Sequence, residues 1–369
     1  MKYLSEFRDP ELVLKYREKL DELVTKEWTL MEVCGGQTHS LVKNGLLELL
    51  PDKVQMIHGP GCPVCVTPLN LIDKAVHLAM DEEVILCSFG DMLRVPGSKM
   101  SLLEAKSRGA DVRILYSPLE AVQIAKKNPQ KEVVFFAVGF ETTAPANALS
   151  VVHAEREKLN NYSILASHVL VPPAMEAVVN DPLAKIDGFL AAGHVCTIMG
   201  IHQYFPLVEN HRLPIIVTGF EPIDLLQGIY MCLKQLEAGE AKLENQYARV
   251  VQPEGNPEAV KVIERIFEIS DREWRGIGVI PNSGYVIREE YKAFDADRKF
   301  KIRIEKAEEN KSCIAGQVLK GIKKPHDCPE FGKNCTPQNP LGAPMVSSEG
   351  ACAAYYHFSK AMGDIEAQV

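Results

Sequence analysis

The feature that most constrains this chain is a series of eight short apolar segments, each ending in a glycine-rich or polar turn and leading into a helical pattern. The first four are LMEVCGG, VQMIHGPG, VILCSFGD and VRILYSP, and the next four are VVFFAVGFE, YSILASHV, IDGFLAAGH and LPIIVTGFE. Continuous apolar strands that alternate with helices are typical of parallel sheets covered by helices on both faces. The sequence therefore predicts an α/β fold.

The two groups of four segments resemble a degenerate internal repeat. LYSPLEAVQIA in the first group echoes VTGFEPIDLLQGI in the second. This pattern predicts two similar Rossmann-like parallel-sheet domains, residues 30–132 and residues 133–242, with one larger eight-stranded sheet as the alternative. Ligands of open α/β sheets bind beyond the carboxyl ends of the strands, and the unusual polar and sulfur-containing residues of this chain follow its strands.

The two ends of the chain follow a different pattern. Asp9 and Pro10 precede an apolar face of helical spacing, which predicts a capped amphipathic helix with Asp9 as the N-cap. After Lys242 the strand–helix alternation stops, and residues 323–345 contain five prolines and two cysteines. Such a segment cannot form regular helix or sheet, and a metal site is the obvious means of ordering it. Residues 1–29 and 243–369 are therefore expected to form an irregular, α-rich third domain.

Composition excludes several classes of protein. A chain of 369 residues can bury a core without disulfides, and a net charge of −8 argues against binding to nucleic acid. The sequence has no apolar run of membrane-spanning length, and its acidic N-terminal residues do not resemble a signal peptide. We therefore expect a cytoplasmic protein. The chain has ten cysteines, and in a reducing compartment those placed close together are expected to be metal ligands or catalytic thiols rather than disulfides.

The strongest metal-ligand pattern lies near the C-terminus and has the spacing C-x14-C-x6-C-x16-C: Cys313, Cys328, Cys335 and Cys352. Four thiolates in a proline-rich segment suit an iron–sulfur cluster or a zinc ion. The spacing matches neither the paired CxxC units of a zinc ribbon nor the compact run of a ferredoxin. It therefore leaves the choice between cluster and zinc open.

A second group of thiols follows the strands of the first block. In GPGCPVC, Cys62 and Cys65 directly precede a helical pattern, the arrangement of thiol–disulfide redox sites, in which a helix N-terminus lowers the thiol pKa. In VCGGQTH, two glycines leave Cys34 at a strand end, and His39 lies five residues further on. Such a Cys–His pair can be a nucleophile with its base or two iron ligands, although a single cysteine at a strand end is more often a core residue.

Three further polar residues are candidates for the site. Glu141 follows the strand VVFFAVGF and His194 follows IDGFLAAG, at strand ends of the same kind as that of Cys34. Polar residues at such positions often only cap the next helix. Glu349, in SSEGAC, either caps a helix or reaches the active face.

Together these residues closely resemble the HypD family, whose members are hydrogenase-maturation scaffolds, and the resemblance extends over essentially the whole chain. It rests on Cys34-Gly-Gly-Gln-Thr-His39, GPGCPVC at 59–65, FGD..RVPG at 89–97, GFETT at 139–143, GHV at 193–195, GFEP.DLLQG at 219–228, ENQY at 244–247, EWRG at 273–276 and MVSSEGAC at 345–352. One departure is Gln37, where some members have histidine. This departure weakens any role for a second imidazole there.

The resemblance implies a function and its cofactors. Family members assemble the Fe(CN)2CO unit of [NiFe]-hydrogenases with a small HypC-type partner, and a HypE-type partner supplies the cyanide. The resemblance implies that Cys34 and a cysteine of the HypC-type protein hold the iron. It also implies two α/β domains plus a cluster domain, and a [4Fe-4S] cluster bound by Cys313, Cys328, Cys335 and Cys352.

On this reading the chain is a redox-active assembly scaffold rather than a simple turnover enzyme. Thiolate coordination suits iron with strong-field ligands, and the CxxC thiols would cycle between dithiol and disulfide. The candidate residues of the centre are Cys34, His39, Cys62, Cys65, Glu141, His194 and Glu349. One alternative is a stand-alone cluster-dependent disulfide reductase of the ferredoxin–thioredoxin type, which has no use for Cys34 or the histidines. Another is a zinc-bound interaction protein.

Overall fold

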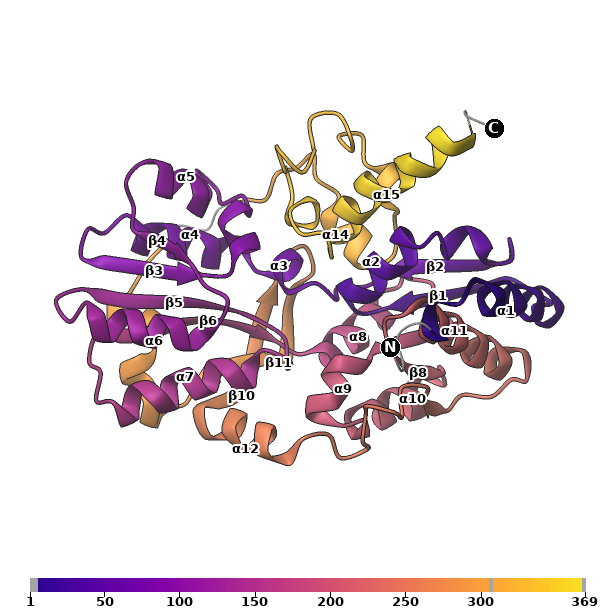
Figure 1. Ribbon diagram of the computed structural model, residues 1–369, viewed down its shortest axis with the longest axis horizontal. Coiled ribbons are helices and arrows are strands. Elements are labelled where there is room, and N and C mark those ends of the chain that lie inside the picture. The colour runs from indigo at the N-terminus through magenta and orange to yellow at the C-terminus, as the bar shows by residue number, and fades with distance from the viewer. Residues whose placement is uncertain (1–5, 305–307, 367–369) are drawn as a thin grey trace.

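The computed structural model describes residues 6–304 and 308–366, whose strands form two sheets that lie side by side (Figure 1). The first sheet has five parallel strands in the order β2-β1-β7-β8-β9. Its strands are β1 (Trp28–Glu32), β2 (Val54–His58), β7 (Gly188–Ala192), β8 (Ile215–Thr218) and β9 (Leu243–Asn245).

The second sheet has six strands in the order β10-β11-β6-β5-β3-β4. The four strands β3 to β6 are parallel, and the hairpin β10–β11 adds two antiparallel strands at one edge. The strands are β3 (Val84–Ser88), β4 (Val112–Ile114), β5 (Glu132–Gly139), β6 (Tyr162–Val169), β10 (Phe267–Trp274) and β11 (Gly278–Ile287).

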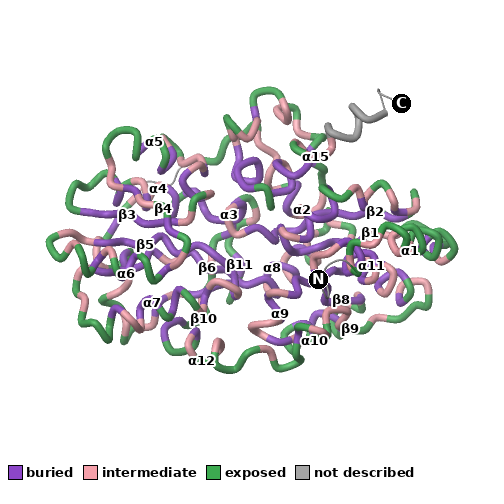
Figure 2. The backbone as a smooth tube through the Cα atoms, in the orientation of Figure 1, coloured by how far each residue is buried: buried purple, intermediate pink, exposed green. Residues whose placement is uncertain are grey.

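Helices cover both faces of both sheets. Successive residues of a strand face opposite sides, so Leu30 and Met31 of β1 belong to two different apolar clusters. On the first sheet, one cluster includes α8 (Val171–Val179), α9 (Gly193–Met199) and α10 (Phe205–His211), and the other includes α1 (Pro10–Leu23), α2 (Gly35–Lys43) and α11 (Pro222–Glu237). The buried backbone continues from both sheets into the junction between them (Figure 2).

The second sheet is covered in the same way. One face packs against α6 (Pro118–Lys127), α7 (Ala144–Arg156) and α12 (Pro257–Ile266), and the other packs against α4 (Leu69–Ala79) and α5 (Leu102–Ser107). The α/β fold with doubly covered parallel strands is therefore confirmed. All eight predicted strands are present, and Asp9 caps α1 by accepting a hydrogen bond from the Glu11 N–H at 2.9 Å.

The predicted pairing of these strands is wrong. Residues 30–132 contribute β1 and β2 to the first sheet but β3 and β4 to the second, and residues 133–242 contribute β5 and β6 to the second sheet but β7 and β8 to the first. The two sheets are therefore not successive repeats of four strands. An apolar segment shows that a strand will be buried, but it does not identify the strand's neighbour.

The predicted third domain is also divided. Helix α1 packs on α11 of the first sheet, β9 extends that sheet, and the hairpin β10–β11 extends the second sheet. Residues 308–359 contain α14 (Ala315–Leu319) and the start of α15 (Ala351–Glu366), and they lie beside α2 and the short helix α3 (Pro63–Val66) (Figure 1). An additional short helix, α13 (Ala296–Phe300), contacts β6. Only the segment after residue 307 thus resembles the irregular region that the sequence predicted.

Candidate metal and thiol-redox centre

Cys34 and His194 meet at the switch point of the first sheet. The strand order runs outward from β1 to β2 on one side and from β7 to β9 on the other, so the chain direction across the sheet reverses between β1 and β7. Cys34 follows β1 as the N-cap of α2, and His194 follows β7 in α9. The Cys34 Sγ lies 3.7 Å from Nδ1 and 3.8 Å from Nε2 of His194. Open α/β sheets bind ligands at this position.

The thiol and the imidazole are both neutral in the metal-free protein. Cys34 is 2% exposed, and burial raises the pKa of its thiol. The backbone N–H groups of Gln37 and Gly36 oppose this shift, whereas the carboxylates of Glu32 and Glu349 add to it. Burial lowers the pKa of His194 to about 4. A neutral imidazole beside a thiol can accept the proton that the thiol loses when a metal binds.

A buried carboxylate that the sequence analysis missed holds the backbone of Cys34. Glu32 is fully buried, and its Oε2 accepts a hydrogen bond from the Cys34 N–H at 2.9 Å. Its Oε1 accepts one from the Thr38 hydroxyl and lies 2.7 Å from Nδ1 of His58. The signal was present in the sequence, because Glu32 is the only charged residue in the segment LMEVCGG.

The CxxC loop lies directly against Cys34. A Cβ on Gly61 would lie 2.2 Å from the Cys34 backbone nitrogen, so only glycine fits where the two loops touch. The Gly35 N–H donates a hydrogen bond to the Gly61 carbonyl at 3.0 Å. Cys62 is the N-cap residue of α3, and both cysteines of the motif are buried. The loop therefore brings the thiol pair to the Cys34 site.

The expected activation of the CxxC pair by a helix N-terminus is not found. The pKa of Cys65 is raised by burial first and then by Cys62, Cys352 and Glu349. Helix α3 has only four residues, too few to build the dipole that lowers a thiol pKa. Burial therefore disfavours the thiolate form of Cys65.

Glu349, in the C-terminal segment, and His39, in α2, both lie near the start of α2 and the CxxC motif. A Cβ on Gly35 would lie 2.6 Å from the Glu349 Cβ and 3.3 Å from the Cys62 Cβ. Nδ1 of His39 lies 3.0 Å from the Ser348 carbonyl oxygen. Partial desolvation and the Asp91 carboxylate raise the pKa of Glu349, whereas His39 lowers it. The structure thus brings Glu349 beside the CxxC motif.

Glu141 follows β5 of the second sheet, and its side chain reaches the start of α8, which follows the neighbouring strand β6. Its Oε1 accepts a hydrogen bond from the Val171 N–H at 2.9 Å, and its Oε2 has no hydrogen-bond partner among the described residues. Burial raises the pKa of Glu141 to about 7. Tyr204 is another buried residue that sequence reasoning missed: burial raises the pKa of its hydroxyl, and Cys196, Glu141 and Cys34 add to the shift.

The four C-terminal cysteines line one small cavity together with apolar side chains such as Val318 and Met345. Within residues 6–304 and 308–366, no three His, Cys, Asp or Glu side chains converge closely enough to hold a single metal ion. The cavity adjoins the CxxC motif, because the charge of Cys352 raises the pKa of Cys65. The two sulfur sites are therefore neighbours.

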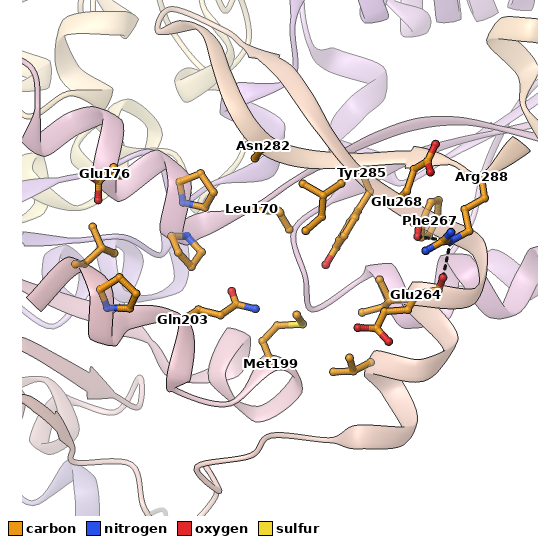
Figure 3. Close-up of a pocket in the computed structure, with 17 residues that line it drawn as sticks. Leu170, Glu176, Met199, Gln203, Glu264, Phe267, Glu268, Asn282, Tyr285 and Arg288 are labelled. Atoms are coloured by element: carbon orange, nitrogen blue, oxygen red, sulfur yellow. Dashed lines mark hydrogen bonds between the residues drawn. The ribbon is translucent and has the colours of Figure 1, made fainter. Parts of the chain in front are cut away.

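The large groove of about 670 Å³ lies elsewhere (Figure 3). It runs between α8, α10, α12 and the hairpin β10–β11, and its lining includes Leu170, Met199, Phe267 and Tyr285. None of the predicted site residues lines it. The thiol chemistry is therefore concentrated at the switch points and not in this groove.

The fold and the site define a protein of two adjoining α/β sheets in which buried thiols follow strands β1 and β2 of the first sheet. The chain belongs to the HypD family: the family model described as "HypD: Hydrogenase formation hypA family" matches residues 11–359. No helix in the described part of the chain is long and apolar enough to span a membrane.

Curated relatives with names that refer to hydrogenase formation or maturation match this chain over nearly their whole length. The chain is 47% identical to the hydrogenase expression/formation protein HupD of Azotobacter chroococcum, with 98% of this chain and 97% of the relative covered. It is 46% identical to the hydrogenase maturation factor HypD of Rhodobacter capsulatus, with 98% and 99% covered. It is 45% identical to the factor of the same name from Escherichia coli, with 97% and 98% covered.

The raised pKa of Glu141 predicts a pH-dependent cost of folding. A carboxyl whose pKa rises on folding from its usual 4.5 to about 7 destabilises the native state increasingly as the pH rises through that window. The free energy of unfolding of the wild type, relative to Glu141→Gln, should fall by on the order of 3 kcal/mol between pH 4.5 and 7, at about 1.4 kcal/mol per pKa unit. Urea unfolding of both proteins across this pH range measures the difference in their free energies of unfolding.

The control is Glu157→Gln, because the pKa of that exposed carboxyl is lowered by Lys126. The wild type should show no such loss relative to this variant. A wild type and Glu141→Gln variant with parallel pH profiles would contradict the assignment of a buried, high-pKa carboxyl.

The contact between Gly61 and Cys34 predicts a strong response to one methyl group. Gly61→Ala should destabilise the protein by about 1–3 kcal/mol, the range of overpacked sites, because the added Cβ overlaps the Cys34 backbone. The matched control is Gly90→Ala, whose Cβ would approach only the Ile114 side chain, at 3.7 Å. Equal urea midpoints for the two variants would show that the loops do not touch.

Proposed function

We propose that this chain is a hydrogenase maturation factor that holds iron with cyanide and carbon monoxide ligands while the Fe(CN)2CO unit of a [NiFe]-hydrogenase is assembled. It would act with a HypC-type protein and receive cyanide from a HypE-type protein. The observation that carries the proposal is the Cys34 thiol, 3.7 Å from His194 and in contact with the CxxC loop at a sheet switch point. Membership of the HypD family and relatives named for hydrogenase maturation support it.

Cys34 has the properties of a ligand for the iron cargo. A soft thiolate suits iron that carries strong-field diatomic ligands. The N–H groups of Gly36 and Gln37 at the start of α2 stabilise the thiolate form, and His194 can take up the thiol proton. Glu32 keeps the Cys34 backbone in place while this proton moves.

The C-terminal cysteines suit a resident [4Fe-4S] cluster. Their thiols border one apolar cavity without converging on one point. Burial raises the pKa of Cys352, and the nearby Cys313, Cys335 and Cys328 add to this shift. A cluster takes one thiolate on each of four irons, whereas a single zinc needs all four on one ion. When bound, the cluster would supply single electrons to neighbouring thiols.

Cys62 and Cys65 form the redox pair next to this cavity. Oxidation of the two thiols forms one S–S bond and releases two electrons and two protons, and reduction reverses this. Both cysteines are buried at the start of α3, which contacts residues Ala343–Met345, and Pro344 and Met345 line the cavity of the C-terminal cysteines. The pair can therefore exchange electrons with the cluster site and with ligands bound near Cys34.

The remaining polar residues surround the cargo site on two sides. Glu349 and His39 border the CxxC motif where Glu349 reaches the surface, and they can position a partner's ligand. Glu141 is buried on the other side, where its raised pKa allows it to hold a proton near neutral pH. These groups would control proton transfer around the iron.

A stand-alone disulfide reductase is the second candidate, and the proximity of Cys352 to Cys65 favours it. The reductase function does not explain why Cys34 and His194 lie together at the end of the first sheet. Turnover of a disulfide substrate by the cluster-loaded chain alone, unaffected by Cys34→Ala, would establish this function instead.

The iron site is tested by removing its ligand. Cys34→Ala, purified anaerobically with its bound partner, should lose the infrared bands of cyanide and carbon monoxide, because the substitution removes the sulfur that would bind the iron. Cys232→Ala is the control, since Cys232 is also fully buried but packs between α11 and the first sheet. Bands of full intensity in Cys34→Ala would exclude Cys34 as the anchor.

The redox pair is tested by counting thiols. Denatured samples of the isolated protein should gain two titratable thiols on reduction, after correction for the cluster, and the double variant Cys62→Ser/Cys65→Ser should gain none. If the wild type and the double variant gain the same number of thiols on reduction, the hypothesis that this pair cycles between dithiol and disulfide is wrong.

A further inference from the structure

An aromatic side chain covers the Cys34–His194 pair from the neighbouring loop of the first sheet. Phe220 lies in the turn between β8 and α11 and stacks on His194, with ring centroids 5.0 Å apart and an angle of 22° between the rings. A Cβ on Gly36 would lie 3.3 Å from the Phe220 ring and 3.7 Å from the Cys34 sulfur. Phe220 is therefore packed over the helix turn that carries the thiol.

The ring of Tyr247 fixes the two loops that carry His194 and Phe220. A Cβ on Gly193 would lie 2.6 Å from the Tyr247 ring, and a Cβ on Gly219 would lie 2.7 Å from it. Tyr247 also contacts the edge of Phe220, with ring centroids 6.3 Å apart and 86° between the rings. A displacement of Tyr247 would therefore move both loops.

Arg249 holds Tyr247 and the Phe220 loop together. Its guanidinium lies 4.5 Å from the centre of the Tyr247 ring and 3.9 Å from that of Phe7, and it binds both oxygens of Asp224 at 2.7 Å. Asp224 is fully buried in the first turn of α11, directly after the Phe220 loop. A bidentate pair of this kind fixes orientation as well as distance.

The N-terminal segment closes the arrangement. Arg8 forms two hydrogen bonds with Glu221, one of them at 2.8 Å, and Phe7 covers the outer face of the Arg249 guanidinium. Glu221 and Asp224 form a capping box at the start of α11. Three segments that are distant in sequence thus hold one loop: residues 6–8, 219–224 and 244–249.

We propose that Phe220 is a positioning residue that sets the orientation of His194 against Cys34, and that Arg249 fixes Phe220 through Tyr247 and Asp224. This inference rests on the proposed iron site, because the oriented His194 is the polar neighbour of Cys34 and of the cargo. It also gives a physical role to the motifs GFEP at 219–222 and ENQY at 244–247.

The first test measures access to Cys34 in the full-length metal-free protein. Phe220→Leu and Arg249→Ala should increase the rate of Cys34 alkylation by iodoacetamide, followed by peptide mass spectrometry, by roughly two- to tenfold, the range for loss of one aromatic or cation–π contact. The conservative variant Phe220→Tyr should restore the wild-type rate. Alkylation of buried Cys232 in the same samples reports any general unfolding.

The chain offers matched controls for both variants. Phe205 pairs with His202 at 5.9 Å, and Arg265 pairs with the Tyr291 ring and with Glu155, so Phe205→Leu and Arg265→Ala remove similar contacts elsewhere. Both should leave Cys34 alkylation unchanged. Equal Cys34 rates in Phe220→Leu, Arg249→Ala and these controls would overturn the inference.

The second test is spectroscopic and separates this inference from the proposed function. In the iron-loaded complex, Phe220→Leu should shift or broaden the cyanide and carbon monoxide bands, and Phe205→Leu should not. Unchanged bands in Phe220→Leu would refute positioning by this residue. A wild-type complex with no such bands would refute the proposed iron site, and the alkylation rates would still decide whether Phe220 and Arg249 order the loops around Cys34.

Discussion

The structure depends on one buried carboxylate at the end of the first strand. Glu32 has no exposed surface, and an ion in that position is costly unless hydrogen bonds replace its water. Its partners are the Cys34 N–H, the Thr38 hydroxyl and His58, whose other ring nitrogen lies 2.9 Å from the Tyr355 hydroxyl. One side chain thereby joins β1, α2, β2 and α15. The helix that carries Cys352 is thus tied to the loop that carries Cys34.

Sequence patterns identified the elements of this fold but not their neighbours. Eight apolar segments became eight strands because their apolar residues are buried, on both faces in all but the edge strand β4, and this is a local property that composition reveals. The sheet to which a strand belongs depends on the route of the chain, which leaves the first sheet after β2 and returns after β6. The hairpin β10–β11 was not predicted, because β10 lies at the edge of its sheet and half of its residues, in the sequence FEISDREW, are charged.

The site was predictable to a similar extent. Residues next to strand ends were found because parallel strands bring their carboxyl ends to one edge, and Cys34 and His194 meet there. Tyr204, Tyr247 and Arg249 were not found, since they lie in helices and loops and approach the site only through tertiary packing. The predicted lowering of the Cys65 pKa was wrong for a related reason. The CxxC motif indicates where a helix starts, but the burial that raises the pKa of Cys65 depends on the whole fold.

The exchange of strands between sheets explains why two separate sulfur sites adjoin. If each block formed its own sheet, the CxxC loop after β2 and the loop after β7 would belong to different domains. Because β1, β2 and β7 share one sheet, the loops of Cys34, Cys62 and His194 lie at one edge, and α3 extends from that edge to contact β5 of the other sheet. Burial raises the pKa of the Cys34 and Cys65 thiols at this edge, and a thiol that coordinates a metal loses its proton outright. Under the proposed function, the burial that suppresses unwanted thiol chemistry would therefore make the reactivity of these thiols conditional on the iron cargo.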